Sequence, residues 1–214
     1  MNPVVVSVAV GRNFPKVVTR LQKGVKKFGN ADFLAWVDEY PPGSPTHQQV
    51  PYGFKVYAIR EAWKRGYDCV LWTDSRLFPI RPYQQVFDYI EEHGYFFMPN
   101  GFSVAQWCVE PALRSLGITR EEAEGMSDIV GGFFGLDKRN PQAVEFLARM
   151  IARSKDGVSF HGPRSSHRHD QTVMSVVRIK MGLGWRDSPE SWLSFPGPGA
   201  KEKEHVIFMA GGKG

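Results

Sequence analysis

The sequence predicts an α/β fold with a mostly parallel central sheet and helices on both of its faces. Strand-like and helix-like segments alternate through residues 4–72, and this order is typical of a parallel sheet covered by helices. The strand candidates are short uncharged runs rich in β-branched residues, which indicates strands buried on both faces. The helix candidates between them are amphipathic, as expected of helices that cover a sheet.

Glycine and proline mark the boundaries of the first elements. Gly11 ends the first strand, Pro15 suits a first helical turn because its missing N–H has no intrahelical partner there, and Gly66 ends the second helix. In chain order we expect a strand at Val4–Val10, a helix from about Pro15, a strand at Asp32–Val37, a helix at Phe54–Arg65 and a strand at Cys69–Trp72.

Capping patterns mark helix starts in the second half. Thr119 and Glu122 have the spacing of a capping box, and Asn140-Pro141 is typical of a helix start. The expected order is a helix near Gln84–Glu92, a strand at Tyr95–Pro99, a helical stretch at Val104–Leu116, a short helix from Thr119, a glycine-rich strand at Ile129–Leu136, a helix from Asn140, a polar loop at 154–168, a helix at Asp170–Met181 and a strand at His205–Ala210.

Composition indicates a globular protein in a reducing compartment. The apolar share of 42% and the charged share of 23% are ordinary for such proteins. No apolar run approaches the roughly 18 residues that span a bilayer, and the start lacks the pattern of a signal peptide. Cys69 and Cys108 form neither a disulfide framework nor a metal-ligand spacing. We therefore expect a cytoplasmic protein without a membrane span.

The positive charge is concentrated at the N-terminus. Residues 1–30 hold six Lys or Arg and no acid, whereas the rest of the chain holds 21 basic against 22 acidic residues. Lys16, Arg20, Lys23 and Lys27 recur at helical spacing. This stripe is either a solvated helix face or a surface for phosphates, of nucleic acid or another anionic acceptor.

Polar residues follow two of the predicted strands, and ligands of parallel α/β sheets bind beyond the carboxyl ends of strands. Val10-Gly11-Arg12 turns into a helix N-terminus, where backbone N–H groups favour an anion. Asp74-Ser75-Arg76 follows the third strand. A carboxylate there either holds a metal or a ribose hydroxyl, or caps a turn.

Three segments together resemble the GT-A glycosyltransferases. In that family a helix carrying a lysine, here Lys55, precedes a strand of the type V-L-W-x-D-x-D, and here Val70-Leu71-Trp72-Thr73-Asp74-Ser75-Arg76 is similar to it. Gly131–Leu136 resembles the acceptor-side strand of the family, and His169-Asp170-Gln171 resembles its D-Q motif at a helix start. The resemblance spans about residues 4–180.

The resemblance implies a single GT-A-like, Rossmann-like domain over residues 1–214, with a nucleotide-binding half (1–100) and an acceptor and sugar half (101–214). It implies transfer of a hexose or pentose from a nucleotide-diphosphate sugar, with a UDP-sugar favoured, to an acceptor hydroxyl. Asp74 and Asp170 are the candidate catalytic residues. The implied donor-binding residues are Val10, Gly11, Arg12, Lys55, Asp74, Ser75, Arg76 and Lys213, and the substrate-binding candidates are Trp107, Gly131, Gly132, His169 and Gln171.

The chain departs from the family where the family binds its metal. Arg76 replaces the second acid of the D-x-D motif, and Phe208 stands where the tail motif H-x-G-x-x-K has its histidine. Mn²⁺ or Mg²⁺ would then depend on Asp74 with His169, since imidazole suits such ions. Alternatively, Arg76 and Lys213 supply the positive charge that a departing diphosphate needs.

Two other functions fit part of the sequence. His161, His167 and His169 could serve a metal-dependent hydrolase together with Asp74 or Asp170, although Asp170 also stands where a helix N-cap is expected. The basic N-terminal helix suits a non-catalytic nucleic-acid-binding module, or a transferase whose acceptor is DNA with hydroxymethylated bases or another anionic polymer. The sequence leaves the acceptor and the oligomeric state open.

Overall fold

The computed structural model describes residues 1–11, 13–186, 191–195 and 203–211. Within these residues the central sheet has five strands in the order β2-β1-β3-β8-β5. Their bounds are β1 (Pro3–Ala9), β2 (Asp32–Val37), β3 (Cys69–Thr73), β5 (Tyr95–Phe96) and β8 (Phe133–Asp137). Strand β1 pairs in parallel with both β2 and β3, so the predicted parallel arrangement holds for this half of the sheet.

The prediction of a mostly parallel sheet was wrong for the other half. Strand β8 pairs antiparallel with both β3 and β5, which makes the sheet mixed. The predicted single strand Ile129–Leu136 is in fact β7 (Ser127–Ile129) and β8, separated at Gly131 and Gly132. After β5 the chain leaves the sheet to form β6 (Pro99–Ser103), which pairs with β7. After β7 the chain returns through Gly131-Gly132 to β8, which runs antiparallel to β3.

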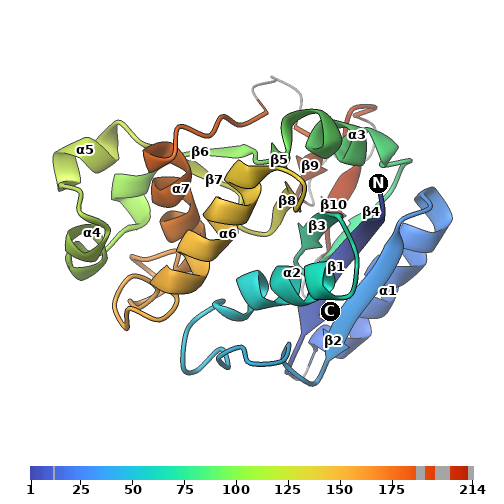
Figure 1. The fold of residues 1–214 in the computed structure, drawn as a ribbon, viewed down its shortest axis with the longest axis horizontal. Coiled ribbons are helices and arrows are strands. Elements are labelled where there is room, and N and C mark those ends of the chain that lie inside the picture. Colours follow the sequence, from blue (N-terminus) through green and yellow to red (C-terminus); the bar gives the residue numbers. More distant parts are fainter. Residues whose placement is uncertain (12, 187–190, 196–202, 212–214) are drawn as a thin grey trace.

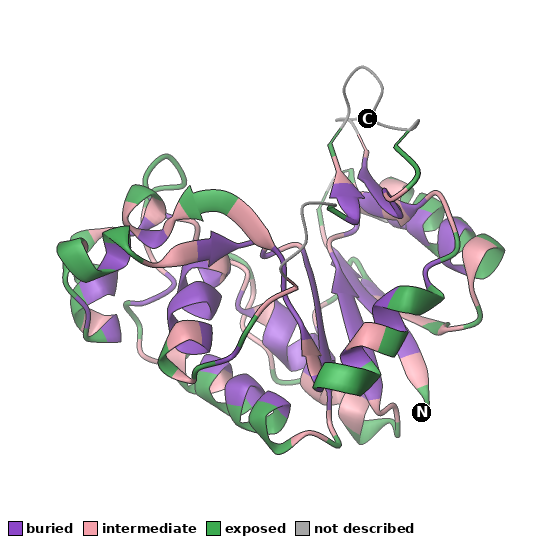
Figure 2. Cartoon of the chain, turned by 90° about the horizontal axis from the view of Figure 1, so that it is seen from above, coloured by how far each residue is buried: buried purple, intermediate pink, exposed green. Residues whose placement is uncertain are grey.

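Helices cover both faces of the sheet, as predicted. Helices α1 (Phe14–Phe28) and α3 (Gln84–His93) pack on one face, and α2 (Phe54–Lys64) and α6 (Pro141–Arg153) pack on the other. Alternate residues of β1 serve the two cores, since Val5 belongs to the cluster of α1 and α3 whereas Val4 belongs to that of α2 and α6. Figure 2 shows the buried strands between helices whose outer faces are exposed.

A second group of elements extends from the carboxyl edge of the sheet. It contains β6, β7, the short helix η1 (Val104–Trp107), α4 (Glu110–Leu116), α5 (Arg120–Glu124) and α7 (Asp170–Lys180). The predicted helical stretch Val104–Leu116 is interrupted at Cys108 and Val109. Pro111 lacks the N–H that a continuous helix would donate to Trp107 O, and its ring would clash with that carbonyl, so a new helix begins at Glu110. The capping box of α5 is confirmed: Glu122 N–H donates to Thr119 Oγ1 at 3.1 Å, and Thr119 N–H donates to Glu122 Oε2 at 2.6 Å.

A small sheet beside α1 combines β4 (Leu77–Pro79), β10 (Phe208–Ala210) and β9 (Leu193–Ser194). Strand β10 lies within the predicted strand His205–Ala210, whereas β4 and β9 carry no sequence pattern that predicted them. Phe208 is fully buried against Tyr83 and Phe133, so the position compared with a ligand histidine belongs to the core.

None of the helices in the described part of the chain has the length and apolar character needed to cross a membrane. Cys69 and Cys108 are both buried and free.

Candidate active site

A cavity of about 410 Å³ lies where the carboxyl end of β3 meets the start of α7. Seven of the predicted site residues line it: Lys55, Asp74, Gly131, Gly132, His169, Asp170 and Gln171. These residues come from α2, β3, the β7–β8 connection and α7. The fold therefore brings together the three segments whose sequences resemble those of the GT-A glycosyltransferases.

Lys55 is the centre of the cluster. Its ammonium lies 2.9 Å from Asp170 Oδ2, 3.0 Å from Asp74 Oδ1 and 2.8 Å from the carbonyl oxygen of Gly131. An ammonium has three N–H donors, so these three contacts satisfy it completely. Lys55 and Asp170 are buried, whereas the Asp74 side chain is half-exposed to the cavity. All three residues line the cavity, and Asp74 is the most open of them to a ligand.

The pKa values of the pair follow from burial and charge. Burial alone would lower the pKa of Lys55, but the charges of Asp170 and Asp74 outweigh it and raise that pKa. Burial raises the pKa of the Asp170 carboxyl to about 6, against the lowering effect of Lys55. Lys55 is therefore a permanent cation, and Asp170 changes its charge close to neutral pH.

Two glycines allow the side chains to approach. A Cβ at Gly132 would lie 2.8 Å from Asp74 Oδ2, and a Cβ at Gly131 would lie 2.7 Å from Gln171 Cβ. The backbone also participates, since Asp74 N–H donates to Gly132 O at 2.9 Å and Gly131 N–H donates to Gln171 Oε1 at 3.2 Å. Any side chain at either position would displace a residue of the cluster.

Asp128 in β7 fixes the orientation of Gln171, and sequence reasoning missed it. Its Oδ2 accepts from Gln171 Nε2 at 2.6 Å and from Asn100 Nδ2 at 2.8 Å, while its Oδ1 accepts from Ser175 Oγ at 2.5 Å. Asp128 is fully buried, and burial raises its pKa. No motif distinguishes this residue, because its partners come from β6 and two turns of α7.

Asp170 does not cap α7. His169 occupies the N-cap position, its side chain makes no capping hydrogen bond, and Asp170 is the first helical residue. The capping alternative was therefore wrong, because the carboxylate of Asp170 is engaged by Lys55 instead. His169 and Tyr52, which both line the cavity, have positive φ angles of 51° and 59°. Such backbone strain in non-glycine residues is frequent at functional sites.

The histidines contact the backbone. His167 Nε2 lies 2.9 Å from Ser159 O, and His169 Nδ1 lies 3.0 Å from Phe160 O. Burial lowers the pKa of both rings, that of His167 to about 4, so both are neutral at pH 7. Within the described residues no three His, Cys, Asp or Glu side chains are grouped as metal ligands.

A divalent cation between Asp74 and Asp170 does not fit the arrangement, because the Lys55 ammonium occupies the space between the two carboxylates. Asp74 Oδ1 also accepts from Trp72 Nε1 at 3.1 Å. The assignment of Asp74 and His169 to Mn²⁺ or Mg²⁺ stays a prediction.

The remaining predicted residues lie outside the cavity lining. Val10, Gly11, Ser75, Arg76 and Trp107 do not line it. The guanidinium of Arg76 lies over the Phe14 ring at 5.2 Å. Gly11 and Asp74 nevertheless follow neighbouring parallel strands, β1 and β3, and so belong to the same edge of the sheet. Arg12 and Lys213 lie outside the described residues.

Several lining residues had not been predicted: Tyr52, Leu77, Val130, Arg164, Arg168, Leu193 and Phe195. Arg164 and Arg168 belong to the polar loop 154–168, whose basic residues were the available indication. Tyr52 follows the proline-rich loop and contacts the rings of His47, Phe54 and His169. Leu193 and Phe195 reach the cavity through the small sheet, which no local pattern indicated.

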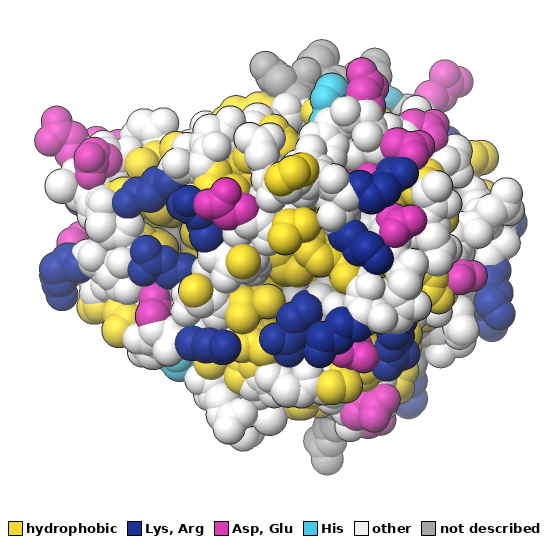
Figure 3. Space-filling model, in the orientation of Figure 1, with side chains coloured by type: hydrophobic (Ala, Val, Ile, Leu, Met, Phe, Trp, Pro, Cys, Tyr) yellow, Lys and Arg dark blue, Asp and Glu magenta, His cyan; other side chains and the backbone are white. Residues whose placement is uncertain are grey.

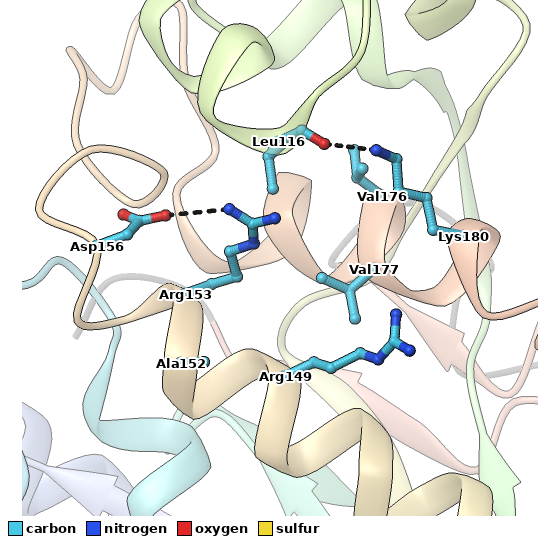
Figure 4. Close-up of a pocket in the computed structure, with 8 residues that line it drawn as sticks. All are labelled: Leu116, Arg149, Ala152, Arg153, Asp156, Val176, Val177 and Lys180. Carbon is cyan, nitrogen blue, oxygen red and sulfur yellow. Dashed lines mark hydrogen bonds and ion pairs between the residues drawn. The ribbon is translucent and has the colours of Figure 1, made fainter.

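A second cavity of about 300 Å³ lies between α4, α6 and α7. Figure 4 shows Lys180 reaching the carbonyl oxygen of Leu116 and Arg153 reaching Asp156. Lys180 also donates to Gly117 O at 3.0 Å, so it binds the last carbonyls of α4. These cations hold helices together, and the cavity contains none of the predicted site residues.

Comparison with known proteins identifies the fold. No model of a known protein family matches the chain, and no curated protein matches it. Among solved structures, the chain is similar to the crystal structure of a glycosyltransferase involved in the glycosylation of the major capsid of PBCV-1. The two sequences are 15% identical, and the structures superpose with a TM-score of 0.60. The match covers 98% of this chain and 93% of that chain. At this identity the likeness establishes a glycosyltransferase fold.

Proposed function

We propose that the protein is a glycosyltransferase that moves a sugar from a nucleotide-diphosphate donor to an acceptor hydroxyl. The observation that carries the proposal is the cluster of Lys55, Asp74 and Asp170 at the carboxyl edge of the sheet, within a cavity of about 410 Å³. Ligands of α/β sheets bind at this edge. The glycosyltransferase fold of the chain supports the same assignment, and a GT-A-type enzyme using a UDP-sugar is the specific form that we propose.

The donor nucleotide is assigned to the side of Asp74, whose half-exposed carboxylate can accept hydrogen bonds from ribose hydroxyls. Its diphosphate is assigned to the start of α1 after the Gly11 turn, because the N–H groups of a helix N-terminus favour an anion. Transfer leaves negative charge on the departing diphosphate, and a fixed cation nearby stabilises that charge. Lys55 is held in place by its three contacts, and its charge offsets one of the two neighbouring carboxylates, so the site is less negative where the diphosphate arrives. The chemistry proposed here therefore uses a tethered ammonium where related enzymes use a metal.

The transferred hexose or pentose is assigned to the side of Asp170, Gln171 and the Gly131-Gly132 turn. Asp170 is ionised above a pKa of about 6, so at neutral pH it accepts hydrogen bonds from sugar hydroxyls. Gln171 is held by Asp128 and by Gly131 N–H, so the sugar meets a rigid surface. This preorganisation is what catalysis by positioning requires.

The two alternative functions gain no support from the site. The rings of His167 and His169 contact backbone carbonyls, which suits a structural role better than a hydrolase centre. On the face drawn in Figure 3, the described Lys and Arg side chains form separate small groups with acids between them.

The buried free cysteines agree with the cytoplasmic location that we continue to propose.

Nucleotide-dependent stabilisation tests the proposal. Thermal unfolding would be followed with UDP, GDP, UDP-sugars, and Mn²⁺ or Mg²⁺ alone. A ligand at a hundred times its Kd adds about 2.7 kcal/mol to the stability of the folded state. We expect a shift with UDP and UDP-sugars, and no comparable shift with metal alone.

Asp74→Asn should remove most of the UDP-dependent shift, measured relative to the variant's own Tm. Asp88→Asn is the matched control, since Asp88 is an exposed carboxylate on α3. An undiminished UDP shift in Asp74→Asn would remove Asp74 from the donor site. The absence of any nucleotide effect on the wild-type protein would contradict the proposed function itself.

A further inference from the structure

Two arginines line the cavity in addition to its central cluster of Lys55, Asp74 and Asp170. Asp74 and Asp170 share the single ammonium of Lys55. Arg164 and Arg168 also line the cavity, and they come from the loop between α6 and α7, at the lower left of Figure 1. In the described part of the chain neither arginine lies within ion-pair distance, 4.0 Å, of a carboxylate. Two arginines therefore line the cavity without a carboxylate of the described residues within ion-pair distance of either.

Arg168 is held in place from two sides. Its guanidinium carbon lies 3.7 Å from the centre of the Trp107 ring, and its backbone N–H donates to Trp107 O at 3.0 Å. Its Nη1 donates to Arg164 O at 3.4 Å. Stacking on an indole fixes a planar guanidinium while leaving its edges free to donate. Arg168 is thus preorganised for a planar oxyanion that accepts two parallel hydrogen bonds.

An aromatic surface continues from this arginine. Trp107 contacts Phe102 edge to face, with ring centroids 5.9 Å apart, and Phe102 is exposed. Ligand sites combine such apolar surfaces with a few fixed polar groups. A ring with one apolar face and one acidic substituent would satisfy both the aromatic surface and the arginine pair.

Arg168 is adjacent to the residues assigned to the transferred sugar. Gln171 N–H donates to Arg168 O at 3.1 Å, and His169 and Asp170 follow Arg168 directly in the chain. A group bound by the arginines would therefore lie next to the sugar and not at the Gly11 turn. We propose that Arg164 and Arg168 form an acceptor subsite for a saccharide that carries a carboxylate. This inference rests on the proposed function, because it names the acceptor of that same site.

Binding of two matched sugars tests the subsite. Methyl β-D-glucuronide and methyl β-D-glucoside differ only in a carboxylate in place of a hydroxymethyl group, and their affinities can be measured by ligand-observed NMR, with and without UDP. We expect the wild-type protein to bind the glucuronide at least about tenfold more tightly, as one charge-assisted bidentate contact provides. In Arg168→Gln this preference should fall to about twofold or less, and Arg168→Lys should be intermediate because lysine lacks the planar fork.

The controls separate this inference from its alternatives. Arg149→Gln removes an exposed cation that pairs with Glu145 on α6 and does not line the candidate active-site cavity. This variant should keep the preference for the glucuronide. UDP affinity should be unchanged in Arg168→Gln, and a loss of UDP affinity would assign the arginine to the donor diphosphate instead. Equal binding of the two sugars by the wild-type protein would overturn the subsite.

A single-stranded DNA oligonucleotide that binds more tightly than the glucuronide and is released by Arg168→Gln would overturn the assignment to a saccharide. Failure of the proposed function has a different signature. In that case UDP would not bind the wild-type protein, whatever the two glycosides do.

Discussion

At the scale of single residues, the charge of the Asp170 carboxyl changes with pH close to neutrality. Its carboxyl has a pKa of about 6, mainly because burial disfavours the charged form. The free group has a pKa of 3.8, so the folded state holds this proton more tightly than the unfolded chain does. The contribution of Asp170 to stability is therefore greatest below pH 3.8 and is lost as the pH rises through 6.

We expect sugar transfer to change in the opposite direction over this window. If transfer needs the ionised carboxylate, its rate should fall about tenfold per pH unit below pH 6. Measuring kcat/KM between pH 4.5 and 8 checks this, with Asp170→Asn as the variant that should lose both the rate and the acidic limb. A limb centred near pH 4, or one that persists in Asp170→Asn, would show that another group is responsible.

Lys55 leads to a prediction about metal. Because its ammonium lies between the carboxylates of Asp74 and Asp170, we expect transfer to persist within about twofold after treatment with EDTA. Lys55→Met should lower kcat by about a hundredfold or more, the usual effect of removing one charge-stabilising group. Since breaking a buried ion pair also costs about 3–5 kcal/mol, the unfolding of this variant must be measured in parallel. Loss of activity in EDTA and its recovery with Mn²⁺ would contradict the prediction.

The sequence indicated the residues of the central cluster but not the residues that orient them. Lys55, Asp74, Asp170 and Gln171 stand in short motifs with an expected order along the chain. Asp128 contributes through contacts to β6 and α7, and such long-range contacts leave no local pattern. The same holds for Arg164 and Arg168, whose role depends on where the loop before α7 folds.

At the scale of elements, features defined by a few neighbouring residues were predicted well. The capping box of Thr119 and Glu122 and the N-cap at Asn140 are both present, and β2 has the predicted bounds. Strand direction is different, because it depends on the path of the chain between strands. The run Ile129–Leu136 looks continuous in sequence, yet Gly131 and Gly132 divide it where Asp74 and Gln171 approach.

The N-cap of α6 provides a test at this scale. Asn140 Oδ1 accepts from Gln142 N–H at 2.8 Å and from Ala143 N–H at 3.3 Å, and its Nδ2 contacts His93 O at 3.4 Å. Asn140→Ala should destabilise the protein by about 1–2 kcal/mol, the usual effect of losing an N-cap. Urea unfolding measures this, and the exposed Gln142→Ala is the control, expected within about 0.5 kcal/mol of wild type. Equal midpoints for the two variants would show that the cap contributes nothing.

At the scale of the whole molecule, the basic helix and the candidate site belong to different layers. Helix α1 packs with α3 on one face of the sheet, whereas Lys55 belongs to α2 on the other. Arg20 is already engaged over the Phe78 ring at 4.0 Å, which leaves Lys16 and Lys23 among the exposed cations of α1. The charge of α1 should therefore act on polyanions at long range without contributing to the subsite of Arg164 and Arg168.

Replacing Lys16 and Lys23 by Gln tests this separation. Any affinity for duplex DNA should fall linearly with the logarithm of salt concentration, and the slope should decrease by about 0.9 for each lysine that contacted a phosphate. The UDP-dependent shift in Tm and the preference for glucuronide over glucoside should stay as in wild type. Lys64→Gln with Lys155→Gln changes the net charge equally at exposed positions outside α1 and should leave more of the salt slope intact. If the α1 variant lost the glucuronide preference, the two positive regions would form one continuous surface, and a long anionic polymer spanning both would become the better candidate for the acceptor.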